Sequence, residues 1–227
     1  MKESDQYRGL PSPSLQLSYD TRKTLIDLPD LKEMQLESTP ILKAVKDRRS
    51  IRRYSIQPLT LKELSLLLWC TQGVKEVMDS VTLRTVPSAG ARHAFETYLL
   101  VNRVQGLQPG LYRFLAIEHK LMEVNLDPQL ADEVTKACLN QGFVKTCAVT
   151  FIWTAIPYRM VWRYGERGYR YLHIDVGHVC QNLYLAAETM GAGACAIGAF
   201  DDEALNNALG IDGKEQWAIY LATVGKT

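Results

Sequence analysis

Several familiar signatures are missing from this chain of 227 residues, and each absence argues against a class of protein. No Gly-x-Gly-x-x-Gly follows an expected strand and no Walker phosphate loop is present, which disfavours a Rossmann dinucleotide fold and a P-loop NTPase. The five cysteines include no Cys-x-x-Cys pair, so we expect reduced thiols rather than a disulfide framework. No apolar signal core follows residues 1–5, and the longest apolar stretch, 148–156, is too short to span a bilayer. The sequence predicts a cytoplasmic protein that does not enter a membrane.

A strong charge of one sign is also missing. The net charge is +1, so no global field draws the chain to nucleic acid or to an anionic membrane. An apolar share of 47% is typical of a globular protein with a hydrophobic core. Without an internal repeat we expect one domain, at 39–227, after an N-terminal arm at 1–38. The polar arm either lies on the surface, wraps a neighbour, or is disordered.

The basic charge that is present is concentrated in one segment. Arg48, Arg49, Arg52 and Arg53 place four guanidinium groups within six residues, with Ser50 among them. A guanidinium group offers a planar fork of donors that matches phosphate oxygens, and two or three such groups at a helix end can converge on one phosphate. A solvated basic turn is the alternative interpretation. The segment therefore predicts an anion site, with phosphate as the first candidate.

Elsewhere the pattern predicts helices and strands without regular alternation. Thr39 and Pro40 are typical of a helix start, and Thr60 with Glu63 forms an expected capping box. We expect helices at 40–49, 60–73, 127–140, 173–190 and 201–210, and strands at 96–102, 111–114, 120–124, 148–155, 193–200 and 217–224. This order favours a mixed α+β layer fold over a doubly wound parallel sheet.

Several separated segments agree with one another in order and spacing. They are Arg48-Arg49-Ser50-Ile51-Arg52, Pro87-Ser88-Ala89-Gly90-Ala91, residues 164–171, Asp175-x-Gly177-His178-x-x-Gln181-Asn182-Leu183, residues 194–201 and the closing Val224-Gly225. The first resembles the phosphate-binding motif of the FMN-dependent nitroreductase family. The others resemble its SagB-type dehydrogenase branch, which includes the azoline oxidases of thiazole and oxazole peptide biosynthesis. The resemblance covers about residues 40 to 227.

This resemblance implies an α+β, nitroreductase-like fold with a central, mostly antiparallel sheet flanked by helices, in an intertwined homodimer with FMN at the interface. Arg48, Arg49, Ser50 and Arg52 would hold the FMN phosphate and ribityl chain. Pro87, Ser88, Ala89 and Gly90, supplied by the other subunit, would cover the isoalloxazine. Ile197, Gly198 and Ala199 would line the ring, and Lys226 would lie near the phosphate. Small residues suit this task because a flat ring needs close approach of the backbone.

The implied activity is the transfer of a hydride from NADH or NADPH, through flavin N5, to a small conjugated acceptor such as a nitroaromatic compound or a quinone. The catalytic positions would be Arg163 and Tyr164, where azoline oxidases carry a Lys-Tyr pair. Arginine almost never loses its proton, so Arg163 is a poor base. This difference favours a stand-alone reductase over a peptide-modifying subunit. Arg92 is a candidate for a positive charge near the pyrimidine edge of the flavin.

Two other functions stay open. One is an azoline dehydrogenase that acts on thiazoline or oxazoline peptides within a complex. The other is a non-catalytic phosphate or nucleic-acid binding module, although the neutral net charge disfavours nucleic acid. No metal site is expected, because Asp175 and His178 lack a third ligand nearby. These two residues and Asn182 share a helix face, and we interpret them as a polar cluster that ties the helix to residues 164–171.

Overall fold

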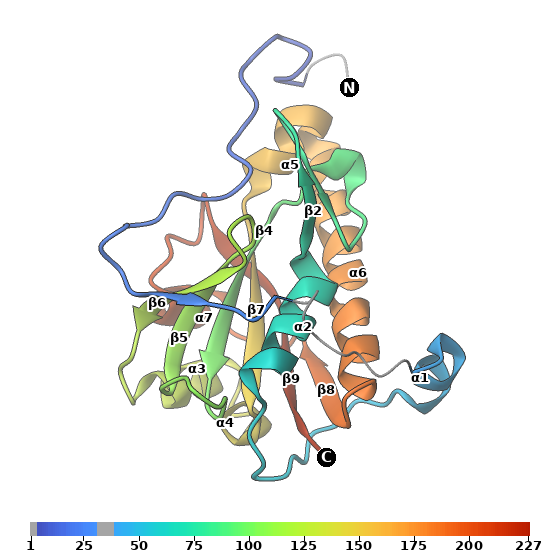
Figure 1. Cartoon of the computed structure of the whole chain (residues 1–227). Coiled ribbons are helices and arrows are strands. Elements are labelled where there is room, and N and C mark those ends of the chain that lie inside the picture. Colours follow the sequence, from blue (N-terminus) through green and yellow to red (C-terminus); the bar gives the residue numbers. More distant parts are fainter. Residues whose placement is uncertain (1–3, 31–38) are drawn as a thin grey trace.

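The computed structural model describes residues 4–30 and 39–227, and in them a seven-stranded antiparallel sheet forms the centre (Figure 1). The strand order is β1-β6-β5-β4-β7-β9-β8. The strands are β1 (Leu25–Asp27), β4 (Phe95–Val101), β5 (Gly110–Leu115), β6 (Lys120–Asn125), β7 (Val149–Ala155), β8 (Ala192–Ile197) and β9 (Trp217–Lys226). The predicted α+β fold with a mostly antiparallel sheet is therefore confirmed.

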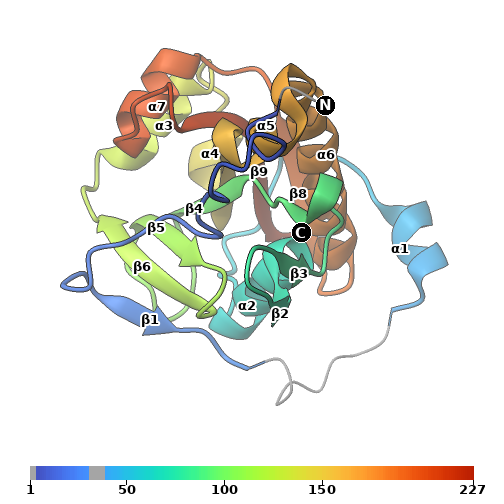
Figure 2. The same cartoon turned by 90° about the horizontal axis from the view of Figure 1, so that it is seen from above.

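Helices cover both faces of this sheet (Figure 2). They are α1 (Ile41–Asp47), α2 (Leu61–Gln72), α3 (Leu130–Ala137), α4 (Phe143–Thr146), α5 (Pro157–Tyr164), α6 (Gly168–Glu188) and α7 (Asp202–Leu209). Helices α2 and α6 pack on one face, and α3, α4 and α7 pack on the other. A separate hairpin of β2 (Val74–Val77) and β3 (Thr82–Arg84) follows α2.

The two core layers follow from the alternation of side chains along the central strands. On β4, Phe95, Leu99 and Val101 join the cluster under α2 and α6, whereas Tyr98 and Leu100 join the cluster under α3 and α7. The whole of β4 is buried, and so is the whole of β7. A strand with helices on both faces reads as a continuous apolar run, as 148–155 does.

Side-chain caps mark the start of two helices, α2 and α7. At α2, the Thr60 Oγ1 atom accepts a hydrogen bond from Glu63 N (3.2 Å) and Glu63 Oε2 accepts one from Thr60 N (2.8 Å), which confirms the capping box. Asp201 caps α7, and Gly210 ends it with a φ of 69°. The expected Thr39 cap is wrong, because α1 has Pro40 at its N-cap position and no side-chain cap.

Two described helices, the four-residue α4 and α5, are missing from the prediction. Residues 158–171, which read only as an aromatic, basic stretch, form α5, a 3₁₀ turn at Gly165–Arg167 and the start of α6. Pro157 occupies the first turn of α5, where a missing N–H costs nothing. Helix α6 accordingly begins at Gly168, five residues before the predicted 173.

The described part of the arm, residues 4–30, lies against the same chain. Gln6 N donates to Trp162 O (2.8 Å), Leu17 N donates to Glu96 Oε1 (2.9 Å), and β1 pairs with β6. The rest of the predicted arm, 31–38, lies outside the described residues. Among the helices that are described, none combines the length and apolar character needed to cross a membrane.

Candidate active site

The arginine-rich segment is laid along the edge of the sheet. Ser50 forms a parallel bridge with Ala194 on β8, and Ile51 N donates to Ala194 O (2.9 Å). The Tyr54 hydroxyl then donates to Ile51 O (2.6 Å) and lies 2.8 Å from Thr223 Oγ1. Because β8 is an edge strand, its free backbone groups are available for this docking. The segment is therefore positioned by backbone contacts rather than by its arginine side chains.

Two glycines make this docking possible. A Cβ atom on Gly193 would lie 2.5 Å from Ile51 Cγ1, and one on Gly225 would lie 2.9 Å from Tyr54 Cδ1. Contacts this short do not occur, so any larger residue at Gly193 would displace the segment. Neither Gly193 nor Tyr54 was singled out from the sequence. The closing Val224-Gly225 was noted only as part of a motif.

Among the described residues, these arginine side chains have no acidic partner. Arg49 and Arg52 are exposed and Arg48 is half-buried. The Arg48 guanidinium lies 5.2 Å from the centre of the Tyr184 ring, and that of Arg52 lies 5.9 Å from the Phe143 ring. Within residues 4–30 and 39–227, no carboxylate forms an ion pair with these three arginines. Such a concentration of unpaired donors, at a fixed edge, is suited to an anion with several oxygens.

A hydroxyl group completes this cationic edge. The Tyr184 hydroxyl, on α6, accepts a hydrogen bond from Ala196 N (2.7 Å) and lies 3.1 Å from Ser50 Oγ. When Tyr184 donates to Ser50, the Ser50 hydrogen remains available to an anion. The predicted Arg48, Arg49, Ser50 and Arg52 are thus brought together beside β8.

The predicted ring-lining residues continue from the same strand. Ile197 ends β8, and Gly198 and Ala199 follow it with exposed backbone. Gln141 Nε2 donates to Ala199 O (2.9 Å) and to Cys138 O (2.9 Å), which fixes the loop against the end of α3. An exposed, immobilised backbone can lie close to a flat ligand.

The second predicted group, Pro87 to Gly90, is fixed to the middle of α6. Ser88 Oγ donates to Asp175 Oδ2 (2.7 Å), and Ala89 N donates to the same oxygen (3.1 Å). Burial raises the pKa of Asp175 above its usual value, although the bonds from Ser88 and Ala89 oppose that shift. The interpretation of 175, 178 and 182 as one cluster is wrong. His178 is exposed, and Asn182 donates to Cys70 O (2.9 Å) at the end of α2.

The same loop meets the predicted catalytic pair. Gly90 has a φ of 58°, in the left-handed region that favours glycine. A Cβ atom there would lie 2.5 Å from Tyr164 Oη and 2.8 Å from Arg163 Nε. The structure therefore brings Gly90, Arg163 and Tyr164 together.

Within one chain, the arginines at 48–52 and the pair Arg163–Tyr164 lie at different ends of α6. Tyr184, beside the arginines, is near its C-terminal end, and Tyr164 precedes its N-terminal end (Figure 1). At 1.5 Å per residue, a helix of this length spans about 30 Å. The arginines and the pair Arg163–Tyr164 of one chain are therefore separated by most of the length of α6.

Two predicted positions have other partners. Lys226 Nζ forms an ion pair with Glu63 and donates to Met190 O (2.7 Å), so it ties the end of β9 to α2 and α6. Arg92 is buried, donates to Ser80 O (2.6 Å) and lies over the Trp162 ring. Burial lowers the pKa of Arg92, and the charge of Arg163 lowers it further.

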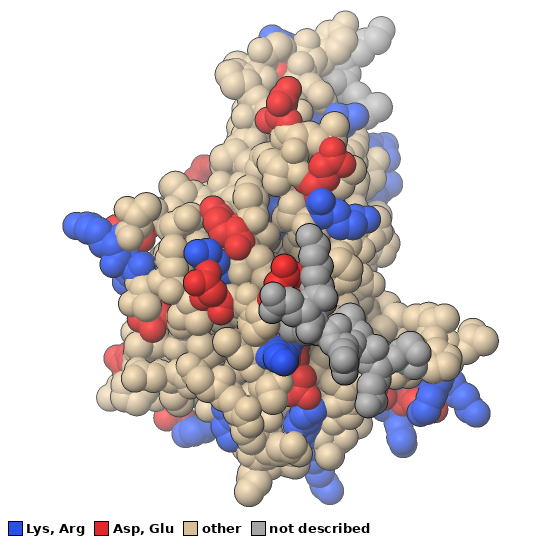
Figure 3. All heavy atoms as spheres, viewed as in Figure 1, with Lys and Arg blue, Asp and Glu red and all other residues tan. Residues whose placement is uncertain are grey.

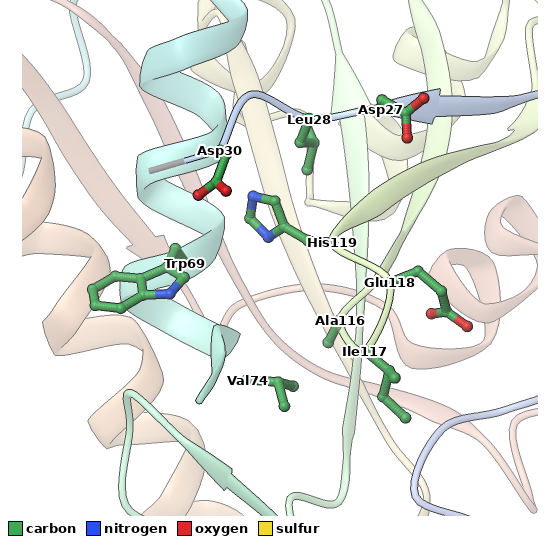
Figure 4. A pocket seen from close by; sticks show the side chains of 9 residues that line it. All are labelled: Asp27, Leu28, Asp30, Trp69, Val74, Ala116, Ile117, Glu118 and His119. Carbon is green, nitrogen blue, oxygen red and sulfur yellow. The ribbon is translucent and has the colours of Figure 1, made fainter. Parts of the chain in front are cut away.

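A separate hollow of about 430 Å³ lies between the end of α2 and the β5–β6 turn (Figure 4). On its wall His119 Nε2 lies 2.8 Å from Ser65 Oγ, and the Asp30 carboxylate lies beside the imidazole. These residues are far apart in the sequence, so their spacing did not reveal them. Ser65 is fully buried and donates to Pro29 O (2.8 Å), which makes it unsuitable as a nucleophile.

Comparison with known proteins agrees with this geometry. The family model described as the nitroreductase family matches residues 45–226, and the chain belongs to this family. A predicted nitroreductase of Methanocaldococcus jannaschii, MJ1384, is 38% identical over 201 residues, which are 88% of this chain and 96% of that protein. The trifolitoxin-processing protein TfxB of Rhizobium leguminosarum bv. trifolii is 33% identical over 112 residues, 48% of this chain and 30% of TfxB.

Solved structures share the fold. A predicted nitroreductase from Ralstonia eutropha JMP134 superposes with a TM-score of 0.74 at 24% identity, covering 96% of this chain and 94% of that one. The NADPH:FMN oxidoreductase of Vibrio harveyi, solved in complex with NAD+, superposes with a TM-score of 0.59 at 15% identity, covering 82% and 68%. The family and these relatives support an oxidoreductase of the nitroreductase type.

Proposed function

We propose that this protein is an FMN-dependent oxidoreductase that takes a hydride from NADH or NADPH and passes it to a small conjugated acceptor, such as a nitroaromatic compound or a quinone. The observation that carries the proposal is the edge of β8, where Arg48, Arg49 and Arg52 stand beside Ser50 with no carboxylate partner among the described residues. A phosphate monoester supplies the charge and the oxygens that this edge lacks. The residues present therefore fit FMN, whose ring accepts and donates the hydride.

The chain's own contribution is binding and orientation. Arg48, Arg49, Ser50 and Arg52 hold the phosphate and the ribityl chain, and the fixed backbone of Ile197, Gly198 and Ala199 lines the ring. Lys226, which forms an ion pair with Glu63, adds positive charge at the C-terminal end of β9. Backbone N–H groups at a ring edge stabilise negative charge that develops there.

A second copy of the chain completes the proposed site. Pro87, Ser88, Ala89 and Gly90 of that copy would cover the ring; within one chain this loop is bound at Asp175, nine residues or about 14 Å along α6 from Tyr184 beside the arginines. Helix α1 supports a homodimer: it stands away from the body and exposes Ile41, Leu42 and Val45 by 61%, 80% and 54%. Exposed apolar residues on one helix favour burial against a partner.

The catalytic pair acts on the acceptor. The Tyr164 hydroxyl can donate a proton or a hydrogen bond, whereas Arg163 stays protonated and acts as a fixed positive charge. The Arg163 guanidinium lies 5.6 Å from the centre of the Tyr164 ring, so the two side chains restrain each other.

The visible spectrum of the purified protein tests cofactor binding, and an anaerobic assay tests the reaction. We expect a yellow protein that is bleached by NADH or NADPH and reoxidised by a quinone or a nitroaromatic compound. A colourless protein that does not bind added FMN contradicts the proposal. A colourless protein whose anion binding weakens steeply with salt instead supports the phosphate or nucleic-acid binding module. On the face shown in Figure 3, basic and acidic side chains are interspersed, which disfavours nucleic acid.

The second candidate is an azoline dehydrogenase, which the similarity to TfxB favours. Such an enzyme would retain the flavin, would turn over NADH and NADPH poorly, and would oxidise a thiazoline or oxazoline peptide. Arg163 disfavours this reaction wherever a neutral amine is needed as the base. A side-by-side assay with NADPH and a thiazoline peptide separates the two candidates.

A further inference from the structure

A second group of arginines lies inside the molecule, behind the loop that carries Gly90. Arg84 on β3, Arg92 after that loop and Arg159 on α5 are exposed by 6%, 4% and 1%. Glu96, at the start of β4, forms an ion pair with one of them: its Oε1 atom lies 2.6 Å from Arg159 Nη2. Arg84, Arg92 and Glu96 lie within one short stretch of the sequence, whereas Arg159 is more than 60 residues away; all four belong to the described part of the chain.

The hydrogen bonds of Arg159 and Arg92 are incomplete, whereas each guanidinium nitrogen of Arg84 has an acceptor. Arg84 donates to Thr82 Oγ1 (3.0 Å) and to Gln72 Oε1 (2.8 Å). Arg159 uses only Nη2, and its Nε and Nη1 atoms are buried without a partner among the described residues. The Arg92 Nε atom is likewise buried without a hydrogen-bond partner among the described residues. A buried donor without a partner is costly, and a buried guanidinium group with two of them is rare.

The charges do not balance either. Three guanidinium groups face one carboxylate, which leaves an excess of about two positive charges in a region shielded from water. Burial lowers the pKa of Arg84 to about 10, with Arg159 adding to that shift, so Arg84 is still protonated at neutral pH. Burial also lowers the pKa of His93 to about 3, and the charges of Arg84 and Arg92 contribute.

The N-terminal arm closes over this group. Leu17 N donates to the same Glu96 oxygen (2.9 Å), and Leu15 O accepts from Arg84 Nη2 (3.4 Å). Arg113 Nη2 donates to Leu17 O and Ser18 O (3.1 Å each), so a fourth guanidinium group lies under the arm. A water molecule could satisfy the free donors, but it would leave the excess charge uncompensated.

We propose that a small anion of the size of chloride is enclosed beneath the arm, bound by Arg159 Nε and Nη1 beside Arg84 and Arg92. This site is separate from the Arg48–Arg52 edge and does not depend on the proposed redox function. Its ligand class is a monovalent anion that can be desolvated, such as a halide. Nothing in the site requires a phosphate.

Anomalous diffraction from crystals of the full-length protein grown in bromide locates the ion. We expect a bromide peak within hydrogen-bond distance of Arg159 Nε or Nη1. The melting temperature at constant ionic strength should also rise by about 2–4 °C when bromide replaces gluconate. A peak only at the exposed Arg48–Arg52 edge, or a water molecule at Arg159 with a melting temperature independent of the anion, overturns the proposal.

Two variants should change this response in opposite directions. Arg159→Lys keeps the charge beside Glu96 but removes the fork of N–H groups, so the bromide-dependent rise should fall by at least half. Glu96→Gln removes the negative charge and should make the rise steeper. Because both variants leave the Arg48–Arg52 edge intact, anion binding there contributes equally to all three proteins. Equal responses in the wild type and both variants contradict the site.

Discussion

The molecule contains two clusters of arginines that differ in their exposure to solvent and in their partners. Those of the Arg48–Arg52 edge are adjacent in sequence, reach solvent and have no acidic partner among the described residues. Arg84, Arg92 and Arg159 are brought together from β3, the loop after Gly90 and α5, and are almost fully buried; Arg159 is paired with Glu96, and Arg84 donates to the backbone of the arm. The exposed cluster can therefore exchange a ligand, whereas the buried cluster is fixed by the fold around it. The same side chain forms an exposed proposed ligand site at one place and an enclosed proposed anion site at the other.

The largest expected effect tests the buried cluster. Arg159→Met leaves the Glu96 carboxylate buried without its ion-pair partner, which should lower the free energy of unfolding by about 3–5 kcal/mol. Urea denaturation of the variant and the wild type measures the difference. Arg170→Met, at an exposed position on α6, is the matched control and should change it by less than about 0.5 kcal/mol. If Arg159→Met and Arg170→Met lower the free energy of unfolding equally, the buried arginine contributes no more to stability than an exposed one.

The exposed cluster should respond in binding rather than in stability. Arg48→Ala removes a charge-assisted hydrogen bond to the proposed FMN phosphate, worth roughly 1.5–3 kcal/mol, so FMN affinity should fall by about 10- to 100-fold. Fluorescence titration of the apoprotein with FMN measures it, and the unfolding free energy should change little. Unchanged FMN affinity would contradict the assignment of Arg48, and Arg170→Ala provides the control for loss of one positive charge.

The backbone pairing of Ser50 and Ile51 with Ala194 can be disrupted without substituting an arginine. Gly193→Ala places a Cβ atom against Ile51 and should cost about 2 kcal/mol of stability, because the edge segment must move. FMN affinity should fall with it. Gly177→Ala on α6 is the control: a Cβ atom there meets nothing within 4 Å, and alanine should stabilise the helix by about 0.5–1 kcal/mol. If Gly193→Ala binds FMN normally, the positioning role is wrong.

The smallest expected effect concerns pH. Because burial lowers the pKa of His93 to about 3, the unfolded chain binds a proton that the folded chain excludes between about pH 6.5 and 3. The contribution of neutral His93 is complete above pH 6.5 and is lost as the pH falls. Between pH 7 and 5 this loss should be about 1–2 kcal/mol.

His93→Asn should remove that part of the acid sensitivity, and asparagine tolerates the φ of 42° at this position. Denaturation at pH 7 and pH 5 measures it, with His173→Gln at an exposed position as the control. A pH dependence that is the same in the wild type and His93→Asn would show that His93 is protonated in the folded state.

The two clusters also show which features could be predicted from the sequence and which could not. The Arg48–Arg52 segment was found because its residues are neighbours, and the Thr60–Glu63 box and the buried strand at 149–155 were found for the same reason: local spacing determines them. Arg84, Arg159 and Glu96 meet only through the fold, so no spacing marked them. Asp175 was recognised as part of a polar helix face, yet its partner, Ser88, lies 87 residues away. Helix α5 was missed because its aromatic and basic residues form no clear apolar helical pattern, although Met160 and Trp162 are buried.

The backbone pairing of Ser50 and Ile51 with Ala194 on β8 has a consequence for solubility. The outer strand of a sheet exposes unpaired N–H and C=O groups that can recruit strands from other molecules, and β8 is such a strand. The Arg48–Arg52 segment covers part of that row, while a three-residue strand ends the sheet on the opposite side. Substitutions that loosen the segment should therefore promote aggregation on heating before they reduce catalysis at ambient temperature.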